Sequence, residues 1–520
     1  MKLSLFVTGA FCGLVVTTLA AHADTPTDTH TVAIQSGRVA GAVADGVESF
    51  KGIPYAQAPV GPLRWRAPQP VHPWAGVRDA RAYGKDCLQE PFPGDAAPLG
   101  VGLSENCLFM NVWRPAQAAE KKLPVMVWIY GGGFVNGGSS PGVYSGSEFA
   151  KQGIVFVSFN YRVGRFGFFA HPSLTAANAD DGLLGNYGLM DQIAALKWVQ
   201  ANIDKFGGDP GNVTIFGESA GGFSVASLIT STLTDGLFQR AIIESGSGRH
   251  NITPGLTLKQ AESAGTEFAK ANNIDGSGEQ ALRKLRKLPA RKVVNGLNMS
   301  TMRVPTYAGP MIDGKLITGE PQDVYAAGNF HKVPLIVGAN AADLGFPPKV
   351  SSVDDALAPL GAAKKEAARS AYAPTGSAKP DDVAMEIASD QFMVEPARFV
   401  ARTFSGAGAP TWEYRFGYVA DSMKQQWPGA VHASEIPYAF DTLHARYANA
   451  VTAQDSAMAQ QMHAYWVNFA KNGDPNGAGL PQWTRYSTQE DKLLWFAPEG
   501  ASKTSEMTDP WKARLDVVAP

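Results

Sequence analysis

Short apolar runs alternate with segments of helical periodicity through the middle of the chain, and this alternation restricts the fold more than any other feature. The runs 123–130 (LPVMVWIY) and 153–162 (GIVFVSFNYR) end in turn residues, which is typical of buried strands. Further short strands are predicted in 213–216 (VTIF), 238–245 (FQRAIIES) and 333–340 (VPLIVGAN). Before VTIF, apolar residues recur at helical spacing: Leu189, Ile193, Leu196, Val199 and Ile203. The alternation predicts an α/β fold with a mostly parallel central sheet and helices on both faces.

Size and charge narrow the class of protein further. The chain has 520 residues, of which 45% are hydrophobic and 18% are charged, so it can bury a large core. Its formal net charge of -2 provides no basic field for nucleic acid. Short helical patches such as 279–288 (EQALRKLRKL) break the alternation between about 255 and 400, without a Pro/Gly/Ser-rich spacer. We therefore expect one domain over 24–520, with helical insertions on a single scaffold.

The first residues are typical of an export signal. Lys2 precedes an apolar stretch over 3–19, and Ala21-His22-Ala23 forms a small-x-small cleavage site. This predicts a signal peptide over 1–23 and an exported protein, periplasmic or extracellular. The alternative is an uncleaved membrane anchor, although Gly9 and Gly13 interrupt the stretch. No later segment approaches 18 consecutive apolar residues, so we expect no stable membrane insertion.

Two cysteines, Cys87 and Cys107, remain after removal of the predicted signal. In an exported protein an even pair favours a disulfide, and here each cysteine has one possible partner. The alternative is a pair of buried free thiols.

A serine lies between two glycines at a predicted junction of strand and helix. Gly217, Ser219 and Gly221 match G-x-S-x-G, in which a sharp turn lifts a serine hydroxyl out of the sheet. The N–H of Ala220 and the helix N-terminus would then favour an oxyanion beside the serine. The motif alone also occurs by chance, and its position between a predicted strand and a predicted helix is what favours a catalytic serine.

A glycine-rich segment, 130–134 (YGGGF), follows the first predicted strand. Consecutive glycines let backbone N–H donors approach a substrate carbonyl, as acyl transfer requires. The alternatives are a flexible turn or a phosphate loop, and the segment has neither the Lys-Ser/Thr ending nor the GxGxxG spacing of the latter. A spaced metal motif such as HExxH is also missing from the sequence, so we expect no metal and no organic cofactor.

With these motifs the chain resembles the type-B carboxylesterases and cholinesterases, and most closely their secreted bacterial members. The resemblance implies the α/β-hydrolase fold, with additional helical insertions over the active site. It runs in order through most of the chain: FKGIPYAQAPVGPLRWRAP (50–68), SENCLFMNVW (104–113), YGGGF (130–134), FNYRVGRFGFF (159–169), the segment 185–222 that ends in IFGESAGG, HKVPLIVGAN (331–340), HASEIPYAF (432–440) and WVNFAKNGDPN (466–476).

The resemblance implies a role for individual residues. The family's nucleophile falls on Ser219, its oxyanion-hole donors on Gly132, Gly133 and Ala220, and its histidine on His432. The chain order Ser, acid, His leaves five histidines as candidate bases: His250, His331, His432, His444 and His463. His432 lies in a turn-rich stretch that suits an active-site loop. His331 precedes a strand, and His463 sits within a helical pattern.

The acid departs from the family pattern G-x-N-x-D-E-G. The aligned carboxylate is Asp343, which is one methylene shorter than the usual Glu, and Asp313 in PMIDG is the alternative. Glu218 and Glu435 match family carboxylates near the site, where structural hydrogen bonding is at least as plausible as a direct role. Cys87 and Cys107 fall on the family's first disulfide.

Together these observations predict an exported serine esterase that cleaves small carboxylic esters through a Ser-His-Asp triad and an acyl-enzyme. An amidase or lactonase with the same triad is the first alternative, and a non-catalytic binding module is the second. The sequence carries no signal for the oligomeric state.

Overall fold

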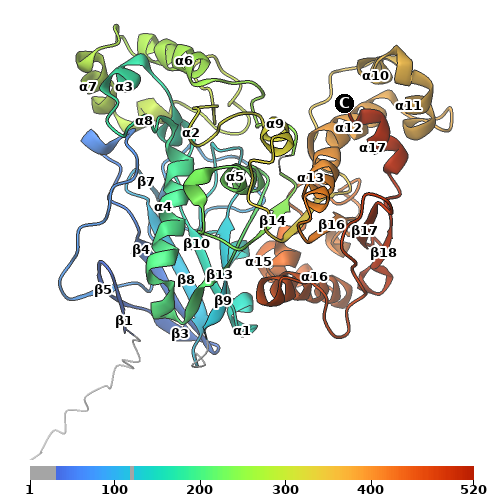
Figure 1. Cartoon of the computed structure of the whole chain (residues 1–520), viewed down its shortest axis with the longest axis horizontal. Coiled ribbons are helices and arrows are strands. Elements are labelled where there is room, and N and C mark those ends of the chain that lie inside the picture. The colour runs from blue at the N-terminus through green and yellow to red at the C-terminus, as the bar shows by residue number, and fades with distance from the viewer. Residues whose placement is uncertain (1–30, 118–121, 247) are drawn as a thin grey trace, which may run out of the picture.

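The computed structural model describes residues 31–117, 122–246 and 248–520 (Figure 1). The predicted signal peptide, 1–23, lies outside the described residues. Within the described ranges, every helix is too short or too polar to cross a bilayer. The organisation of 24–520 as one domain stays a prediction.

One large sheet runs through the part of the chain that the structure describes. Its eleven strands, in spatial order, are β18 (Ser505–Thr508), β17 (Lys492–Phe496), β16 (Thr411–Phe416), β15 (Leu335–Asn340), β14 (Arg240–Glu244), β13 (Gly208–Glu218), β9 (Leu123–Ile129), β10 (Val155–Phe159), β8 (Phe109–Pro115), β4 (Val47–Pro54) and β3 (Ala42–Ala44). The seven strands from β17 to β10 pair in parallel. Antiparallel pairs complete both edges. The predicted mostly parallel sheet is therefore confirmed.

The parallel strands are apolar because both of their faces are buried. Every residue of β10 and β15 is buried, and so are the last residues of β9 from Val125 to Ile129. A strand with no solvent-exposed face is stabilised by a continuous run of Val and Ile rather than by alternating apolar and polar residues. The five strands predicted from the sequence are observed as β9, β10, β13, β14 and β15.

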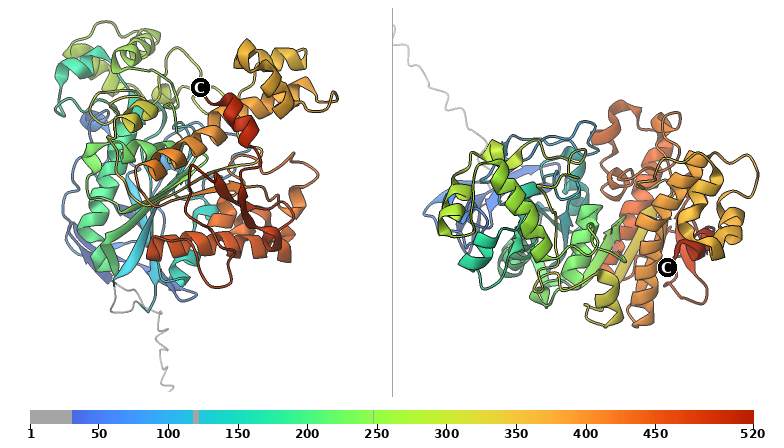
Figure 2. Two further views of the ribbon diagram at one scale, coloured as in Figure 1. Left: turned by 45° about the vertical axis from the view of Figure 1, so that its right-hand side comes forward. Right: turned by 90° about the horizontal axis from the view of Figure 1, so that it is seen from above.

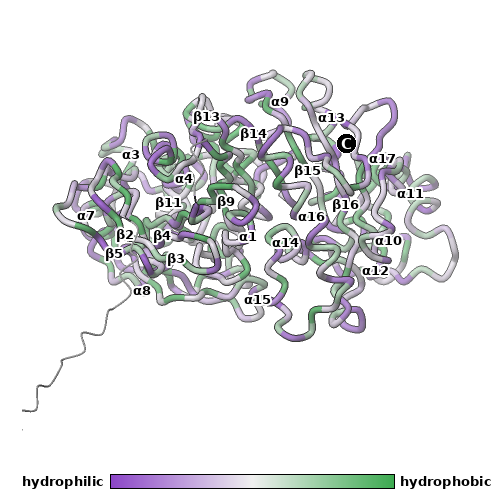
Figure 3. The backbone as a smooth tube through the Cα atoms, turned by 90° about the horizontal axis from the view of Figure 1, so that it is seen from below, coloured by the Kyte–Doolittle hydropathy of each residue, from purple (hydrophilic) through white to green (hydrophobic). Residues whose placement is uncertain are grey.

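Helices cover both faces of the sheet (Figure 2). The predicted helix after β10 is observed as α4 (Tyr187–Asn202). Other helices packed on the sheet are α5 (Ala220–Ile229), α13 (Glu395–Gly406) and α16 (Ala453–Asn472). Figure 3 shows that the central strands are more hydrophobic than the outer helices, as burial of the sheet requires.

Two groups of inserted helices lie on either side of α5 at the top of Figure 1. The first contains α6 (Leu258–Ala271), α7 (Glu279–Lys287) and α8 (Ala290–Val294). The second contains α10 (Val353–Leu357), α11 (Lys365–Tyr372) and α12 (Pro380–Ser389). The helix predicted over 279–288 is thus observed as α7.

Candidate active site

Ser219 occupies a strained turn between β13 and α5. Its backbone angles are φ 56° and ψ −126°, a region that non-glycine residues rarely enter. The flanking glycines permit the turn, since a Cβ on Gly221 would lie 1.9 Å from the carbonyl oxygen of Ile129. A Cβ on Gly217 would lie 2.6 Å from the carbonyl carbon of Gly221. The motif is therefore required by close packing of β9, β13 and α5.

Two backbone hydrogen bonds hold this turn. The N–H of Ser219 donates to the carbonyl of Glu244 on β14 at 3.0 Å, and the carbonyl of Ser219 accepts from the N–H of Phe223 at 2.9 Å. The strained residue is thereby fixed to the neighbouring strand and to its own helix. Such anchoring is what allows a strained conformation to persist at a functional site.

The glycine-rich loop after β9 passes directly beside the serine. A Cβ on Gly131 would lie 3.0 Å from the Cβ of Ser219. Gly132 has φ +103°, and a Cβ there would lie 2.5 Å from the carbonyl oxygen of Asn136, so only glycine fits.

In the described part of the chain, three backbone donors near Ser219 have no acceptor. Within the described residues, the N–H groups of Gly132 and Gly133 make no hydrogen bond. Ala220 is the first residue of α5, and an N–H at that position has no intrahelical acceptor. These donors are free to bind a negatively charged oxygen.

Asp343 and His432 form a close pair. The Nδ1 of His432 lies 2.6 Å from Oδ1 of Asp343. The other oxygen, Oδ2, accepts hydrogen bonds from the hydroxyl of Ser245 at 2.7 Å and from the N–H of Asn340 at 2.8 Å. Burial alone would raise the pKa of Asp343, but His432 and these donors outweigh burial and hold the pKa below its usual value.

His432 joins this pair to the serine turn. Its Nε2 lies 3.2 Å from Oε1 of Glu218, the residue before Ser219. No hydrogen bond between His432 and the hydroxyl of Ser219 occurs in the described part of the chain. Burial would lower the pKa of His432, but the charge of Asp343 and its hydrogen bond outweigh burial and raise that pKa above its ordinary value.

Three buried glutamates surround the pair: Glu218, Glu244 and Glu435. Burial raises the pKa of Glu218 and of Glu435 well above the usual range, and raises the pKa of Glu244 to about 7. Glu435 accepts a hydrogen bond from the side chain of Asn340, the residue whose N–H binds Asp343. Glu218 and Glu435 therefore lie close to the Asp343–His432 pair, where burial and neighbouring carboxylates favour their neutral forms.

The alternative site residues lie in structural positions. Oδ1 of Asp313 accepts the backbone N–H groups of 315, 316 and 317, which closes a turn. His463 is buried, and its Nδ1 lies 2.9 Å from the carbonyl oxygen of Ala439. His331 contacts the carbonyl oxygen of Ser231 at 3.0 Å. His250 lies 3.6 Å from Glu320, and His444 contacts its own helix end at Ala448.

Sequence reasoning missed Ser245 and Glu244. Both follow from sheet order, because β14 lies beside β13 and the carboxyl ends of parallel strands meet at one edge. Glu244 is paired in register with Glu218, and Ser245 comes next in the chain. The predicted strand 238–245 ends in the polar residues Glu244 and Ser245, and this pair was the sequence signal for a functional edge.

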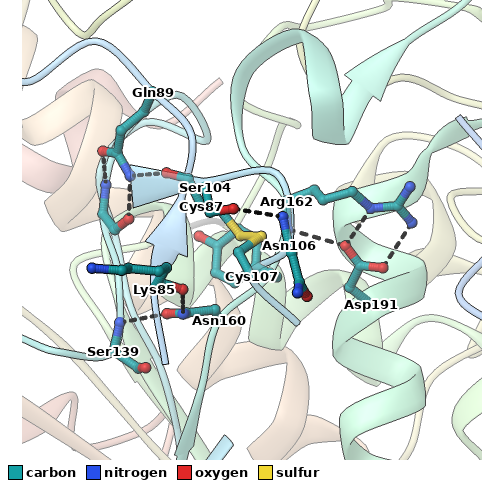
Figure 4. The surroundings of a disulfide bond; sticks show 12 residues. Lys85, Cys87, Gln89, Ser104, Asn106, Cys107, Ser139, Asn160, Arg162 and Asp191 are labelled. Carbon is teal, nitrogen blue, oxygen red and sulfur yellow. Dashed lines mark hydrogen bonds and ion pairs between the residues drawn. A yellow bond between two sulfur atoms is a disulfide. The ribbon is translucent and has the colours of Figure 1, made fainter. Parts of the chain in front are cut away.

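A disulfide joins Cys87 and Cys107, as predicted, and Figure 4 shows its surroundings. Gln89 donates to the carbonyl of Cys87 at 2.9 Å, and its side-chain oxygen accepts from the N–H of Gly137 at 2.9 Å. The N–H of Asn136 in turn donates to the carbonyl of Gly132 at 2.9 Å. A chain of hydrogen bonds thus leads from the disulfide to the loop beside Ser219.

Comparisons with known proteins agree with this geometry. The family model described as "Carboxylesterase family" matches residues 28–511. Fumonisin B1 esterase of Sphingopyxis macrogoltabida is 35% identical, covering 92% of this chain and 88% of that protein. Para-nitrobenzyl esterase of Bacillus subtilis (strain 168) is 36% identical, covering 89% of this chain and 94% of that protein. Human cocaine esterase is 34% identical, over 86% of this chain and 83% of that protein.

A solved structure of PNB esterase superposes with a TM-score of 0.81 and 32% sequence identity, covering 95% of this chain and 100% of the other. Fold, family model and relatives point to the same class. The chain therefore belongs to the carboxylesterase family, with the α/β-hydrolase fold and carboxylic ester hydrolase activity.

Proposed function

We propose that this protein is an exported serine esterase in which Ser219, His432 and Asp343 form the catalytic triad. The observation that carries the proposal is the 2.6 Å contact between His432 and Asp343, with the opposite ring nitrogen directed at the residue before Ser219. A nucleophile, a base and a group that orients the base are the three parts of this mechanism.

In the proposed reaction, the hydroxyl of Ser219 attacks the ester carbonyl while Nε2 of His432 accepts its proton. Asp343 keeps the proton of His432 on Nδ1 and stabilises the imidazolium. The N–H groups of Gly132, Gly133 and Ala220 bind the oxyanion. His432 then protonates the leaving alcohol, and water releases the acid from the acyl-enzyme by the same steps.

Before proton transfer, Nε2 of His432 has to turn from Glu218 to the hydroxyl of Ser219. Nε2 contacts Glu218 in the free protein, and burial favours the neutral form of that carboxyl group. A neutral carboxyl group forms no ion pair with the ring, and among the described residues Oε1 of Glu218 makes no hydrogen bond, so substrate can draw the ring towards the serine. Catalytic hydrogen bonds are often long in free enzymes and shorten in the substrate complex.

The test is hydrolysis of matched ester, amide and lactone substrates by the purified protein and by Ser219→Ala. We expect the wild type to prefer esters, because an alcohol leaves more readily than an amine and the related proteins are named as esterases. Ser219→Ala should lose at least about 10³-fold in kcat. A folded Ser219→Ala variant with near wild-type turnover would refute the nucleophile, and preferred amide or lactone turnover would favour the alternative activities.

Export is the second part of the proposal. The predicted signal over 1–23 and the disulfide support it, because disulfides persist in oxidising compartments. Expression of the full chain, followed by N-terminal sequencing of the secreted or periplasmic product, should find cleavage after Ala23. A full-length cytoplasmic product would contradict export and leave the esterase assignment untouched.

A further inference from the structure

An arginine lies at the rim of the proposed site, on the side of the glycine-rich loop. A Cβ on Gly133 would meet Met299 at 3.4 Å and Met302 at 3.5 Å, so these side chains cover the loop. The N–H of Met299 also donates to the side chain of Asn136 at 2.9 Å. Arg303 follows Met302 and is exposed. It therefore stands one residue away from a side chain that lies beside Gly133, a proposed oxyanion donor.

A phenylalanine reaches the same rim from the opposite side. Phe346 follows Asp343 by three residues, so their Cα atoms lie within about 11 Å. Its side chain is 54% exposed, the highest value among the exposed large hydrophobic residues. The guanidinium carbon of Arg303 lies 4.6 Å from the centre of the Phe346 ring. We call Arg303 and Phe346 the rim pair.

Aromatic contacts connect the rim pair to the nucleophile helix. The ring of Phe346 lies 5.5 Å from that of Phe392, which lies 6.1 Å from that of Phe223. Phe223 is the residue whose N–H binds the carbonyl of Ser219. Phe392 belongs to a π-helical turn, Asp390–Val394, between α12 and α13, and such turns frequently occur at functional sites. The rim pair therefore belongs to the wall of the site rather than to a remote surface.

The charge of Arg303 has no partner in the described part of the chain. Arg249 makes a useful contrast, because it also stacks on a ring, that of Phe399, but forms an ion pair with Glu395 at 2.5 Å. Stacking restricts a guanidinium while leaving its N–H donors free for a planar acceptor. Arg303 is thus prepared to bind an anionic group.

The charge of Asp343, three residues before Phe346, opposes this preference only weakly. Asp343 is buried and paired with His432, which offsets its charge. Glu218, Glu244 and Glu435 are also buried. An incoming anion at the rim would therefore meet the exposed guanidinium first.

We propose that Arg303 is a specificity-determining residue that favours esters bearing a second, ionised carboxylate away from the scissile bond. This inference rests on the proposed triad, because it places the reacting carbonyl at Ser219. The carboxylate would accept N–H bonds from the stacked guanidinium while the ester carbonyl occupies the oxyanion donors.

The experiment compares two pairs of esters in which a carboxylate replaces a methyl group. Mono-4-nitrophenyl glutarate and 4-nitrophenyl pentanoate carry the change on the acid part. 4-Acetoxybenzoate and 4-methylphenyl acetate carry it on the alcohol part. Wild type, Arg303→Ala and Arg303→Lys are measured with each ester, and Ser219→Ala supplies the background rate.

We expect Arg303→Ala to lower the anionic-to-neutral ratio of kcat/KM in at least one pair by about five-fold, through KM. Arg303→Lys should retain part of the ratio, and about 1 M salt should bring the wild type towards the alanine variant. The matched control is Arg78→Ala, an exposed arginine over the ring of Trp74 at 5.3 Å on β5 (Val77–Asp79), in a different sheet. It should change neither ratio.

Unchanged ratios in both pairs for Arg303→Ala, or equal losses in Arg78→Ala, would overturn the inference. Failure of the wild type to hydrolyse the neutral esters would instead refute the proposed function. Calorimetric titration of Ser219→Ala with both acyl esters measures the same preference without turnover. If Ser219→Ala binds the glutarate more tightly than the pentanoate, and adding Arg303→Ala removes this preference, the inference is supported independently of catalysis. Equal binding of the two esters contradicts it.

Discussion

Asp343 shows how the environment of a single carboxylate compensates for a shorter side chain. An aspartate reaches less far than the glutamate of the family pattern, yet its Oδ1 lies 2.6 Å from His432. Ser245, on the end of β14, and the N–H of Asn340 hold the other oxygen in place. The shorter side chain therefore still reaches His432 from the loop after β15.

Asp343→Asn should retain the fold and lower kcat by orders of magnitude. An amide cannot stabilise the imidazolium and favours the wrong tautomer, and the serine-protease example loses about 10⁴-fold. Asp343→Glu should also be impaired, because the extra methylene must fit a gap already closed by the 2.6 Å contact. Steady-state kinetics checks both, with thermal unfolding as the control for folding. A fully active, folded Asp343→Asn variant would exclude this residue as the triad acid.

The pH dependence of kcat/KM should show a rising limb centred above about 6.5, the ordinary histidine value. His432 acts as a base only when neutral, and Asp343 raises its pKa, so activity increases as pH rises through that raised pKa. Glu218→Gln keeps the size of the side chain that contacts Nε2 and provides the control. A limb that stays centred below pH 6 in both proteins would contradict the role of His432.

At the scale of elements, the disulfide and the glycine-rich loop are coupled. The bond closes a separation of 20 residues, and the hydrogen bonds through Gln89 extend from Cys87 to the loop. A cross-link that closes a loop of this length stabilises a protein by about 3 kcal/mol, because it restricts the conformations of the unfolded chain. We expect a second effect, on the positions of the proposed oxyanion donors.

Cys87→Ser with Cys107→Ser should lower the free energy of unfolding by about 3 kcal/mol and should also lower kcat. The fall in kcat follows because oxyanion donors act only when preorganised. Urea unfolding and kinetics well below the unfolding temperature separate the two effects. Gln89→Ala retains the disulfide and is the control. It should lower kcat with a smaller loss of stability. An unchanged kcat in both variants would show that the loop does not depend on this support.

The sequence predicts the central strands of the sheet but not which strands lie side by side. The strands β9, β10, β13, β14 and β15 were predictable because each is a local apolar run with turn residues at its ends. The antiparallel edge β3-β4-β8 was not, because a local pattern does not identify the partner of a strand. Ser245 was missed for the same reason. The contact between Arg303 and Phe346 depends on two loops that only the tertiary fold brings together.

At the scale of the whole molecule, buried acids make stability depend on pH. Glu413 on β16 is buried, and burial raises its pKa to about 8. A carboxyl group with a raised folded pKa binds its proton more tightly in the native state. Its contribution to stability is therefore present below the unfolded pKa of about 4.3 and is lost as pH rises towards the folded value.

Glu413→Gln should therefore gain stability relative to the wild type as pH rises from about 4.5 to 7, by on the order of 3 kcal/mol. The variant has no carboxyl group to ionise at this position and keeps nearly the same volume. Urea unfolding at several pH values measures the difference. The exposed Glu490→Gln is the control, and its difference from the wild type should stay constant. A constant difference for Glu413→Gln as well would contradict this account of the buried acid.

Active-site labelling tests whether Ser219 is the nucleophile and His432 its base. The purified protein is treated with diisopropyl fluorophosphate, digested and analysed by mass spectrometry, alongside Ser219→Ala and His432→Ala. The account predicts one phosphorylated serine, Ser219, with loss of ester turnover in proportion to labelling, no adduct in Ser219→Ala and strongly slowed labelling in His432→Ala. An adduct on another residue that accompanies the loss of activity, or full activity with Ser219 labelled, would contradict it.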